Sequence, residues 1–236
     1  MHLTHHQEPG SLTTPADHDE QLQQLYAEGD ALIAKIREAN APRIFIISGP
    51  SGVGKDSVIE QLRETFPNAK YVVTATTRPM RAGEIDGVHY KFLSREKFEA
   101  DIAAGGFIEN AMVYDNHYGV PKQPILDGLA EDRDVIIKVD VKGAATLREL
   151  IPNTISIFLA PETMDALLQR LRDRKTDDPE VLMKRFRTAS IELAQVEYFD
   201  YVVFNEDEQL DTAVQSIVDI VNTERLRVHR PEIMLA

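Results

Sequence analysis

Residues 43–56 read RIFIISGPSGVGKD, and this stretch decides the fold of the chain. Residues 43–48 are rich in β-branched and aromatic side chains and end at a Gly-Pro pair, which predicts a buried strand. Residues 55–66 place Val58 and Leu62 on one face, which predicts a helix. A glycine-rich turn with a lysine, set between a strand and a helix, is typical of a phosphate-binding loop, or P-loop.

The residues of this P-loop are those that a triphosphate needs. Glycine lets the backbone wrap closely, so that successive N–H groups point at phosphate oxygens. The following helix adds the positive end of its dipole, and Lys55 would reach the β- and γ-phosphates. A glycine-rich turn without a ligand is the alternative, but strand, spacing, lysine and helix all agree with a P-loop. The nucleotide-binding residues that we predict here are Gly49, Pro50, Ser51, Gly52, Val53, Gly54, Lys55, Asp56 and Ser57.

The composition is ordinary for a globular protein and argues against several other classes of protein. The chain has 236 residues, which suit one sizeable domain or one core with inserted lobes. No apolar run approaches the length that crosses a bilayer, and residues 1–20 lack the apolar core of a secretory signal. The absence of cysteine excludes disulfides and thiolate chemistry, and the net charge of -13 argues against a protein that coats nucleic acid. We therefore expect a cytoplasmic protein without nucleic-acid or membrane partners.

Strands and helices alternate along most of the chain, which predicts an α/β fold with a parallel sheet and helices on both of its faces. Residues 75–120 differ, because they hold Gly, Pro, Tyr and charged residues in short segments, which indicates an inserted lobe. Outside that lobe, further strands are predicted over 71–74, 134–140, 154–159 and 200–204, and further helices over 143–150, 162–174, 179–197 and 210–228.

The first 40 residues precede this pattern. Residues 1–18 mix His, Thr, Pro, Gly and acids without periodicity, which predicts a disordered tail. Over 19–40, apolar residues such as Leu22, Leu25 and Ile36 fall at roughly helical spacing, which predicts an extra amphipathic helix. That helix could pack on the core or on a second subunit, so the chain is expected to be a monomer or a homodimer.

Several motifs follow the P-loop in a consistent order. They are ATTRPMRAGE at 75–84, DGVHY at 86–90, FIE at 107–109, NHYG at 116–119, VDVKG at 139–143, RLRDRKT at 170–176 and YVVFN at 201–205. Together these motifs resemble the guanylate kinase family, from about Arg43 to about Val221. The block over 75–90 is long and far more specific than the P-loop alone.

The resemblance implies an architecture and a reaction. A guanylate-kinase-like domain over 41–228 would have a core at 41–73 and 123–228, a mixed α/β GMP-binding lobe at 74–122, and a helical lid at about 170–187. The implied reaction moves the γ-phosphoryl group of ATP to GMP, and also to dGMP, with Mg²⁺ as cofactor, and yields ADP and GDP.

The resemblance places the phosphate of GMP between arginines and tyrosines of the inserted lobe. Arg78 and Arg81 would hold that phosphate, since guanidinium forks suit bidentate phosphate binding. Tyr90 and Tyr118 would add hydroxyl donors. Taken singly, the arginines could be surface charges and the tyrosines half-buried core residues. The joint order of the motifs favours the functional interpretation.

Guanine itself would be recognised by Glu109. A carboxylate can accept from both N1–H and the exocyclic amino group of guanine, whereas adenine offers a lone pair at N1 and no amino group at C2. By resemblance, Thr74 would donate to guanine O6 and Asp140 would be a second acid near the base. Glu109 alone could be a solvated acid, and Thr74 and Asp140 could merely cap strand ends.

The lid would supply positive charge to the reaction. Arg170 and Arg174 lie four apart on a predicted helix and share a face. With Arg185 they would converge on the transferring phosphoryl group, which needs positioning and charge more than covalent chemistry. A salt-bridged surface helix is the alternative. The predicted catalytic residues are Lys55, Arg78, Arg170, Arg174 and Arg185. By resemblance Asn205 matches a position near the adenine, and a turn-forming Asn after a strand is the alternative.

Two residues depart from the family pattern with reversed charge. Asp56 stands where Ser or Thr usually follows the P-loop lysine, and Lys138 stands where the family has an acid. Departures of opposite sign suggest compensation, and we hypothesise an ion pair between Asp56 and Lys138 near the metal site. Alternatively, Asp56 binds Mg²⁺ and Lys138 contacts a phosphate.

Two other functions compete with GMP kinase. A kinase of the same build that acts on a sugar phosphate would have no use for Glu109, because a sugar has no guanine edge. A binding module that has lost catalysis and docks phosphorylated peptides would explain Asp56. It would not explain the full set of P-loop glycines with Lys55.

Overall fold

The computed structural model describes residues 15–38, 41–113, 115–173, 179–228 and 233. The chain divides into two units, Met1–Ala41 and Pro42–Ala236, which we describe separately. Within the described ranges, no helix combines the length and apolarity needed to span a membrane.

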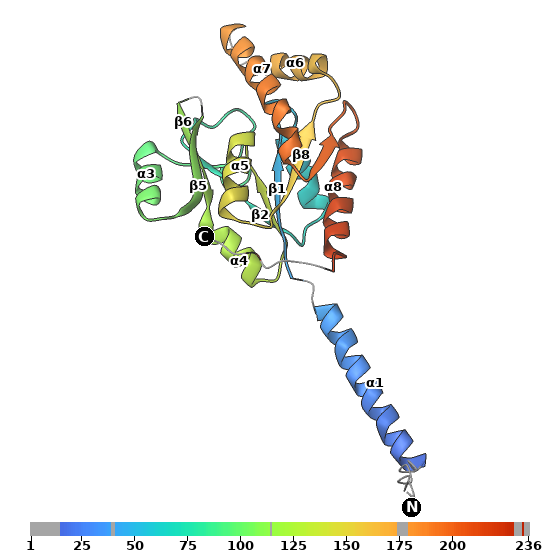
Figure 1. Cartoon of the computed structure of the whole chain (residues 1–236). Helices are drawn as coiled ribbons and strands as arrows, with labels where there is room; N and C mark the ends of the chain where they lie inside the picture. The colour runs from blue at the N-terminus through green and yellow to red at the C-terminus, as the bar shows by residue number, and fades with distance from the viewer. Residues whose placement is uncertain (1–14, 39–40, 114, 174–178, 229–232, 234–236) are drawn as a thin grey trace, which may run out of the picture. The chain divides into compact units, whose positions relative to one another are not determined.

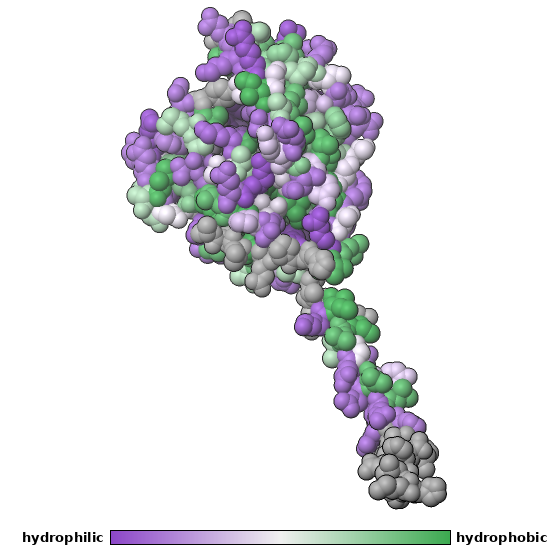
Figure 2. All heavy atoms as spheres, viewed as in Figure 1, coloured by the Kyte–Doolittle hydropathy of each residue, from purple (hydrophilic) through white to green (hydrophobic). Residues whose placement is uncertain are grey.

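The first unit contains helix α1 (Pro15–Glu38). It begins earlier than the boundary at residue 19 that the sequence pattern predicts, because proline is favoured in the first turn of a helix. Residues 1–14 of the predicted tail lie outside the described residues. Large apolar side chains such as Leu25 and Ile36 are exposed along α1, and Figure 2 shows apolar (green) and polar (purple) atoms mixed along this helix.

The second unit is built on a five-stranded sheet. Its order is β2-β7-β1-β8-β9, and every neighbouring pair is parallel. Residues of the three central strands are buried throughout, as expected when helices cover both faces of a parallel sheet. The predicted α/β fold is confirmed. The strands are β1 (Ile44–Ser48), β2 (Lys70–Val72), β7 (Val135–Lys138), β8 (Ile155–Ala160) and β9 (Tyr201–Phe204).

Helices cover this sheet on its two faces (Figure 1). On one face α2 and α8 contribute Leu62 and Ile217 to a buried cluster. On the other, α4 and α5 contribute Ile125 and Leu147. These helices span Lys55–Thr65 (α2), Lys122–Ala130 (α4), Val141–Leu150 (α5) and Leu210–Arg225 (α8).

The inserted lobe contains a second, four-stranded sheet of order β4-β3-β6-β5. Phe98 of helix α3 is fully buried and stacks on Phe107, with ring centroids 4.5 Å apart, which gives the lobe its own small core. The elements are β3 (Ala75–Thr76), β4 (Lys91–Phe92), α3 (Arg95–Ala103), β5 (Phe107–Val113) and β6 (Asn116–Pro121).

Two helices, α6 (Met164–Asp173) and α7 (Pro179–Leu193), occupy the segment predicted as a lid. The helix predicted over 179–197 ends at Leu193 and continues as a 3-10 helix, η1 (Ala194–Tyr198). Residues 174–178, which include the predicted site residue Arg174, lie outside the described residues.

Asp134 joins three elements at the amino ends of the central strands. Its side chain is buried, Oδ1 accepts from the backbone N–H of Arg43 at 2.8 Å, and Oδ2 accepts from Nε of Arg225 at 2.8 Å. The carboxylate therefore ties the residue before β1 and the end of α8 to the start of β7.

Replacement of Asp134 by Ala is expected to lower the free energy of unfolding by about 3 kcal/mol, because it leaves a buried backbone N–H and an arginine without their acceptor. Urea denaturation measures the loss. Glu131→Ala is the matched control, since that exposed acid pairs with Lys70 at the surface, and its unfolding curve should stay close to that of the wild type. Equal curves for all three proteins would contradict this account.

Candidate functional site

The P-loop connects β1 to α2 and can be made only with glycine at its turning points. Gly49, Gly52 and Gly54 have φ of 146°, 93° and 96°, a region that side chains other than glycine rarely adopt. A Cβ on Gly49 would lie 2.3 Å from the backbone oxygen of Leu159, so the loop lies directly against β8. The predicted loop residues are therefore brought together, with Ser57 exposed at the edge of the helix.

Lys55 and Asn205 hold the loop from two sides. Lys55 Nζ donates to the carbonyl oxygens of Gly49 at 2.6 Å and Pro50 at 3.1 Å. Burial lowers the pKa of Lys55, although neighbouring acids oppose the shift. The buried side-chain amide of Asn205 donates to the Val53 carbonyl oxygen at 2.8 Å. Asn205 thus contacts the loop that we predict to hold the nucleotide.

Two of the three predicted lid arginines lie on the loop. Arg185 of α7 is buried and donates to Ser51 Oγ at 2.8 Å. Arg170 of α6 reaches the Val53 carbonyl oxygen at 3.4 Å, and its Nε donates to Asp207 at 2.9 Å. Both arginines therefore lie against the P-loop.

Glu192 is a loop contact that the sequence analysis missed. The backbone N–H of Ser51, one of the P-loop donors, donates to Glu192 Oε2 at 3.2 Å. Burial raises the pKa of this carboxyl group, and the nearby Lys55 opposes the rise. The available signal was spacing: Glu192 lies seven residues after Arg185 in α7, and residues seven apart share a helix face.

A second cation cluster lies in the inserted lobe around Arg78. Its guanidinium binds Glu84 in a bidentate pair, Nη1 to Oε2 at 2.8 Å and Nη2 to Oε1 at 2.7 Å. Its guanidinium carbon lies 5.3 Å from the ring centre of Tyr90, and the Tyr118 side chain is also nearby. Although burial by itself lowers the pKa of Arg78, the bonds to Glu84 raise it overall. Arg81 is less enclosed: its side chain is exposed, while its backbone N–H donates to Glu84 at 2.7 Å.

Glu84 was not among the predicted site residues. It belongs to the RAGE segment of the specific motif, and that motif was the signal that could have identified it. In the structure its carboxylate occupies the fork of Arg78. Tyr90 and Tyr118 pack edge to face beside this pair, with centroids 6.0 Å apart. The structure therefore brings Arg78, Tyr90 and Tyr118 together.

Glu109 stands at an irregularity in β5. The register of β5 against β6 shifts between Phe107 and Glu109, and a bulge of this kind re-aims a side chain. The carboxylate is buried, and burial together with nearby Asp140 raises the pKa of Glu109 to about 7. Asp140 itself caps α5, because its Oδ1 accepts from Gly143 N–H at 2.7 Å. The Thr74 hydroxyl donates to the Lys138 carbonyl oxygen at 3.0 Å nearby.

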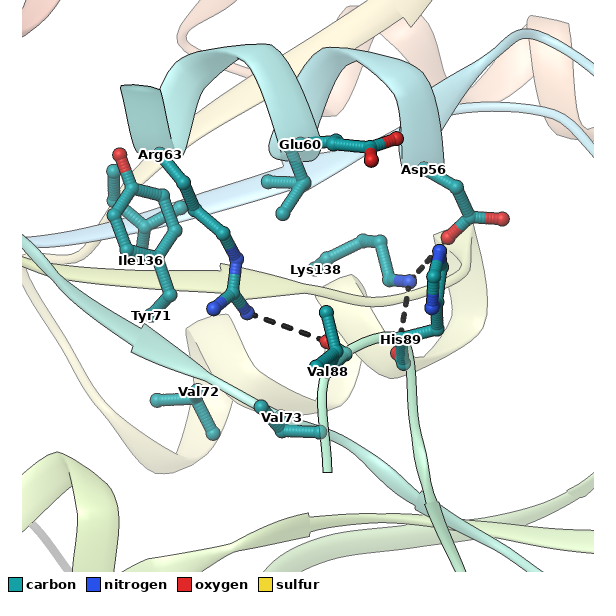
Figure 3. Close-up of a pocket in the computed structure, with 11 residues that line it drawn as sticks. Asp56, Glu60, Arg63, Tyr71, Val72, Val73, Val88, His89, Ile136 and Lys138 are labelled. Atoms are coloured by element: carbon teal, nitrogen blue, oxygen red, sulfur yellow. Dashed lines mark hydrogen bonds and ion pairs between the residues drawn. The ribbon is translucent and has the colours of Figure 1, made fainter. Parts of the chain in front are cut away.

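Asp56 and Lys138 form the ion pair that the reversed charges suggested. Figure 3 shows Lys138 reaching from β7 to Asp56 in the first turn of α2. Lys138 Nζ also lies 3.5 Å from the carbonyl oxygen of His89. The pair therefore stands where the P-loop helix, the central sheet and the inserted lobe meet.

A family model, curated relatives and a solved structure name the same family for this chain. A family model described as guanylate kinase matches residues 41–224. A guanylate kinase of Carboxydothermus hydrogenoformans is 41% identical over 187 residues, which cover 79% of this chain and 91% of the relative. The chloroplastic/mitochondrial guanylate kinase 2 of Oryza sativa subsp. japonica is 44% identical over 190 residues, which cover 80% and 67%. The crystal structure of guanylate kinase from Anaplasma phagocytophilum superposes with a TM-score of 0.68 at 28% identity and covers 81% of this chain and 90% of that one.

Gly49→Ala is expected to abolish measurable ATP binding and to lower the free energy of unfolding by about 2 kcal/mol, because the new Cβ meets backbone that cannot move aside. Calorimetric ATP titration and urea denaturation measure the two effects. Gly105→Ala is the matched control: it also has positive φ, 68°, but nothing lies within 4 Å of its Cβ. It should cost about 1 kcal/mol of stability and leave ATP affinity unchanged. Normal ATP binding by the Gly49 variant would overturn the steric argument.

Proposed function

Because this chain belongs to the guanylate kinase family and is an ATP-dependent kinase of GMP, we propose how its own residues divide that work. The proposal rests on one observation: the glycines and lysine of a P-loop occur in one chain with a buried carboxylate in the inserted lobe, Glu109. The P-loop suits the phosphates of ATP. The buried carboxylate suits a base that presents two N–H donors, as guanine does.

The phosphate of GMP is held by Arg78 and Arg81, with hydroxyl contacts from Tyr90 and Tyr118. Arg78 already presents a bidentate fork, which Glu84 occupies in the structure. A phosphate dianion offers the same pair of acceptor oxygens with more charge, so it can replace the carboxylate in that fork. Arg81 is exposed at the same turn and is able to close over the phosphate.

Guanine is recognised by Glu109, which accepts from N1–H and the exocyclic amino group. Thr74 donates to O6 once its hydroxyl turns away from the Lys138 carbonyl oxygen. Asp140 lies beside Glu109 as a second acid. Neither the base contacts nor the phosphate contacts require the ribose 2′-hydroxyl, which supports dGMP as a second acceptor.

ATP lies on the P-loop with its phosphates at the backbone donors, at Lys55 and at the lid arginines. For this, Lys55 leaves the carbonyl oxygens of Gly49 and Pro50, and Glu192 gives up the N–H of Ser51. Arg170 and Arg185 already touch the loop, and Arg174 completes the predicted set. Asn205, which binds the loop, is proposed to stand near the adenine.

Transfer of the phosphoryl group then needs mainly the correct positions of ATP and GMP and positive charge around the transferring group. An oxygen of the GMP phosphate forms a bond to the γ-phosphorus of ATP as the bond to the bridging oxygen breaks, and ADP leaves. Because that oxygen is already ionised, no general base is required. The cations of the P-loop and lid offset the charge on the transferring group.

Magnesium fits the donor set beside Lys55. The Asp56 carboxylate is a hard oxygen ligand in the first turn of α2 and its side chain is 42% exposed, so it can hold Mg²⁺ directly or through water, with phosphates as the other ligands. Bound Mg²⁺ would neutralise the β- and γ-phosphate oxygens. We further propose a cytoplasmic monomer or homodimer that binds GMP and ATP and has no nucleic-acid or membrane partner.

Phosphoryl transfer from ATP with Mg²⁺ is expected for GMP and dGMP but not for AMP, CMP or UMP, as measured by a coupled ADP assay. Glu109→Gln should lower kcat/KM for GMP about 100-fold, because the amide presents an N–H group where guanine also donates. Asp101→Asn, in an exposed pair on α3, is the control and should leave the rate unchanged. Equal use of AMP, or an unaffected Glu109 variant, would refute the base-reading role.

Guanosine affinity is expected to depend on pH through Glu109. Since the free carboxyl group has a pKa of about 7, it is ionised and able to accept both N–H groups above that pH. Below pH 7 it is protonated, so the dissociation constant of guanosine should rise about tenfold per pH unit. Titrations between pH 5.5 and 8 measure this, and guanosine avoids the titration of a phosphate. The Glu109→Gln variant should show a flat profile, and a flat wild-type profile would contradict the assignment.

A further inference from the structure

Lys138 is the last residue of β7 and ends at the carboxyl edge of the central sheet. It is paired in register with Ile47, two residues before Gly49 on the neighbouring strand. The residue is 8% exposed, which is unusual for lysine. A buried ammonium group at the edge of the sheet where the P-loop begins is a charge that the reaction scheme above does not use.

The surroundings of this ammonium belong to the acceptor side of the site. Nζ lies 4.2 Å from the centre of the Tyr90 ring, and the Arg78 guanidinium lies 5.3 Å from the same ring. Lys138 and Arg78 therefore both lie close to one tyrosine, whose hydroxyl we assign to the GMP phosphate. Although burial alone lowers the pKa of Lys138, Tyr90 and Asp56 raise it overall, so the group stays charged.

The two members of the ion pair differ in their access to water. The side chain of Lys138 is 9% exposed and that of Asp56 is 42% exposed. A buried ammonium group needs an anionic partner, because an unpaired buried charge is costly. The carboxylate can turn into water without that cost. A phosphate that arrives beside Tyr90 can thus replace Asp56 as the partner of Lys138.

We propose that Lys138 is a further substrate-binding residue, whose ammonium group leaves Asp56 and binds the phosphate of GMP. The inference rests on the proposed placement of that phosphate beside Arg78 and Tyr90. In the absence of substrate Asp56 keeps the site neutral. On binding, the dianion takes the place of the carboxylate, as it does in the fork of Arg78.

A purely structural role makes a different prediction. If the pair only ties α2 to β7, Lys138→Met and Asp56→Asn both disturb that tie, and each should weaken the binding of GMP and of guanosine to a similar degree. If Lys138 binds phosphate, the two variants diverge. Loss of the ammonium removes a ligand, whereas loss of the carboxylate removes a competitor.

Calorimetric titrations of GMP and guanosine, without ATP or Mg²⁺, distinguish these roles. We expect Lys138→Met to raise the dissociation constant of GMP about tenfold, the effect of one charged hydrogen bond, and to leave that of guanosine unchanged. Asp56→Asn should not raise the dissociation constant of GMP. Lys138→Arg should recover most of the lost affinity. Equal weakening of GMP and guanosine, or equal loss in the Met and Asn variants, would overturn the proposal.

Two further measurements keep the result interpretable. Thermal melting confirms that each variant is folded, and Lys138→Gln replaces the Met variant if that one does not fold. If the wild-type protein and the Lys138 variant bind GMP equally well, this inference is wrong, but the assignment as a GMP kinase is unaffected. Wild-type protein that binds no GMP would count against the proposed acceptor site itself.

Discussion

The close approach of Gly49 to the backbone of Leu159 is the constraint on which the rest of the site depends. A Cβ added to Gly49 would lie only 2.3 Å from that carbonyl oxygen, so no side chain fits at this position. The loop must therefore turn sharply off β1. The turn directs the backbone N–H groups inward and starts α2 at Lys55. Lys55, Asn205, Arg170 and Arg185 all bind atoms of this loop. Their positions follow from its course.

A second principle is that carboxylates pair with several cations of the candidate site. Arg78 is paired with Glu84, Lys138 with Asp56, and Arg170 with Asp207. Glu192 accepts a hydrogen bond from a P-loop N–H group, at the position where a phosphate oxygen would bind. A chain with a net charge of -13 can thus hold local cations in place, because acidic side chains neutralise Arg78, Lys138 and Arg170.

The sequence allowed the core and the P-loop to be predicted because both are local patterns. Strand, glycines, lysine and helix lie within 43–66, and the buried strands form continuous apolar runs. The strands of the inserted lobe could not be predicted individually, since β3 and β4 have two residues each and are too short to show a hydrophobic period. Glu192 was missed because its contact joins residues 141 positions apart. The bulge that aims Glu109 is likewise a property of strand pairing. The pair of Asp56 and Lys138 could be hypothesised because two charges were reversed together.

The contact between Asp134 and Arg225 also has a mechanical consequence. Arg225 is the last residue of α8, and Asp134 lies at the start of a central strand of the sheet. A protein-unfolding motor that pulls on the segment after α8 would therefore load this half-buried ion pair directly, before it could peel α8 from α2. Resistance to such pulling is set by the rate of the first rupture rather than by overall stability. This one carboxylate would therefore influence how long the folded enzyme survives a degradation machine.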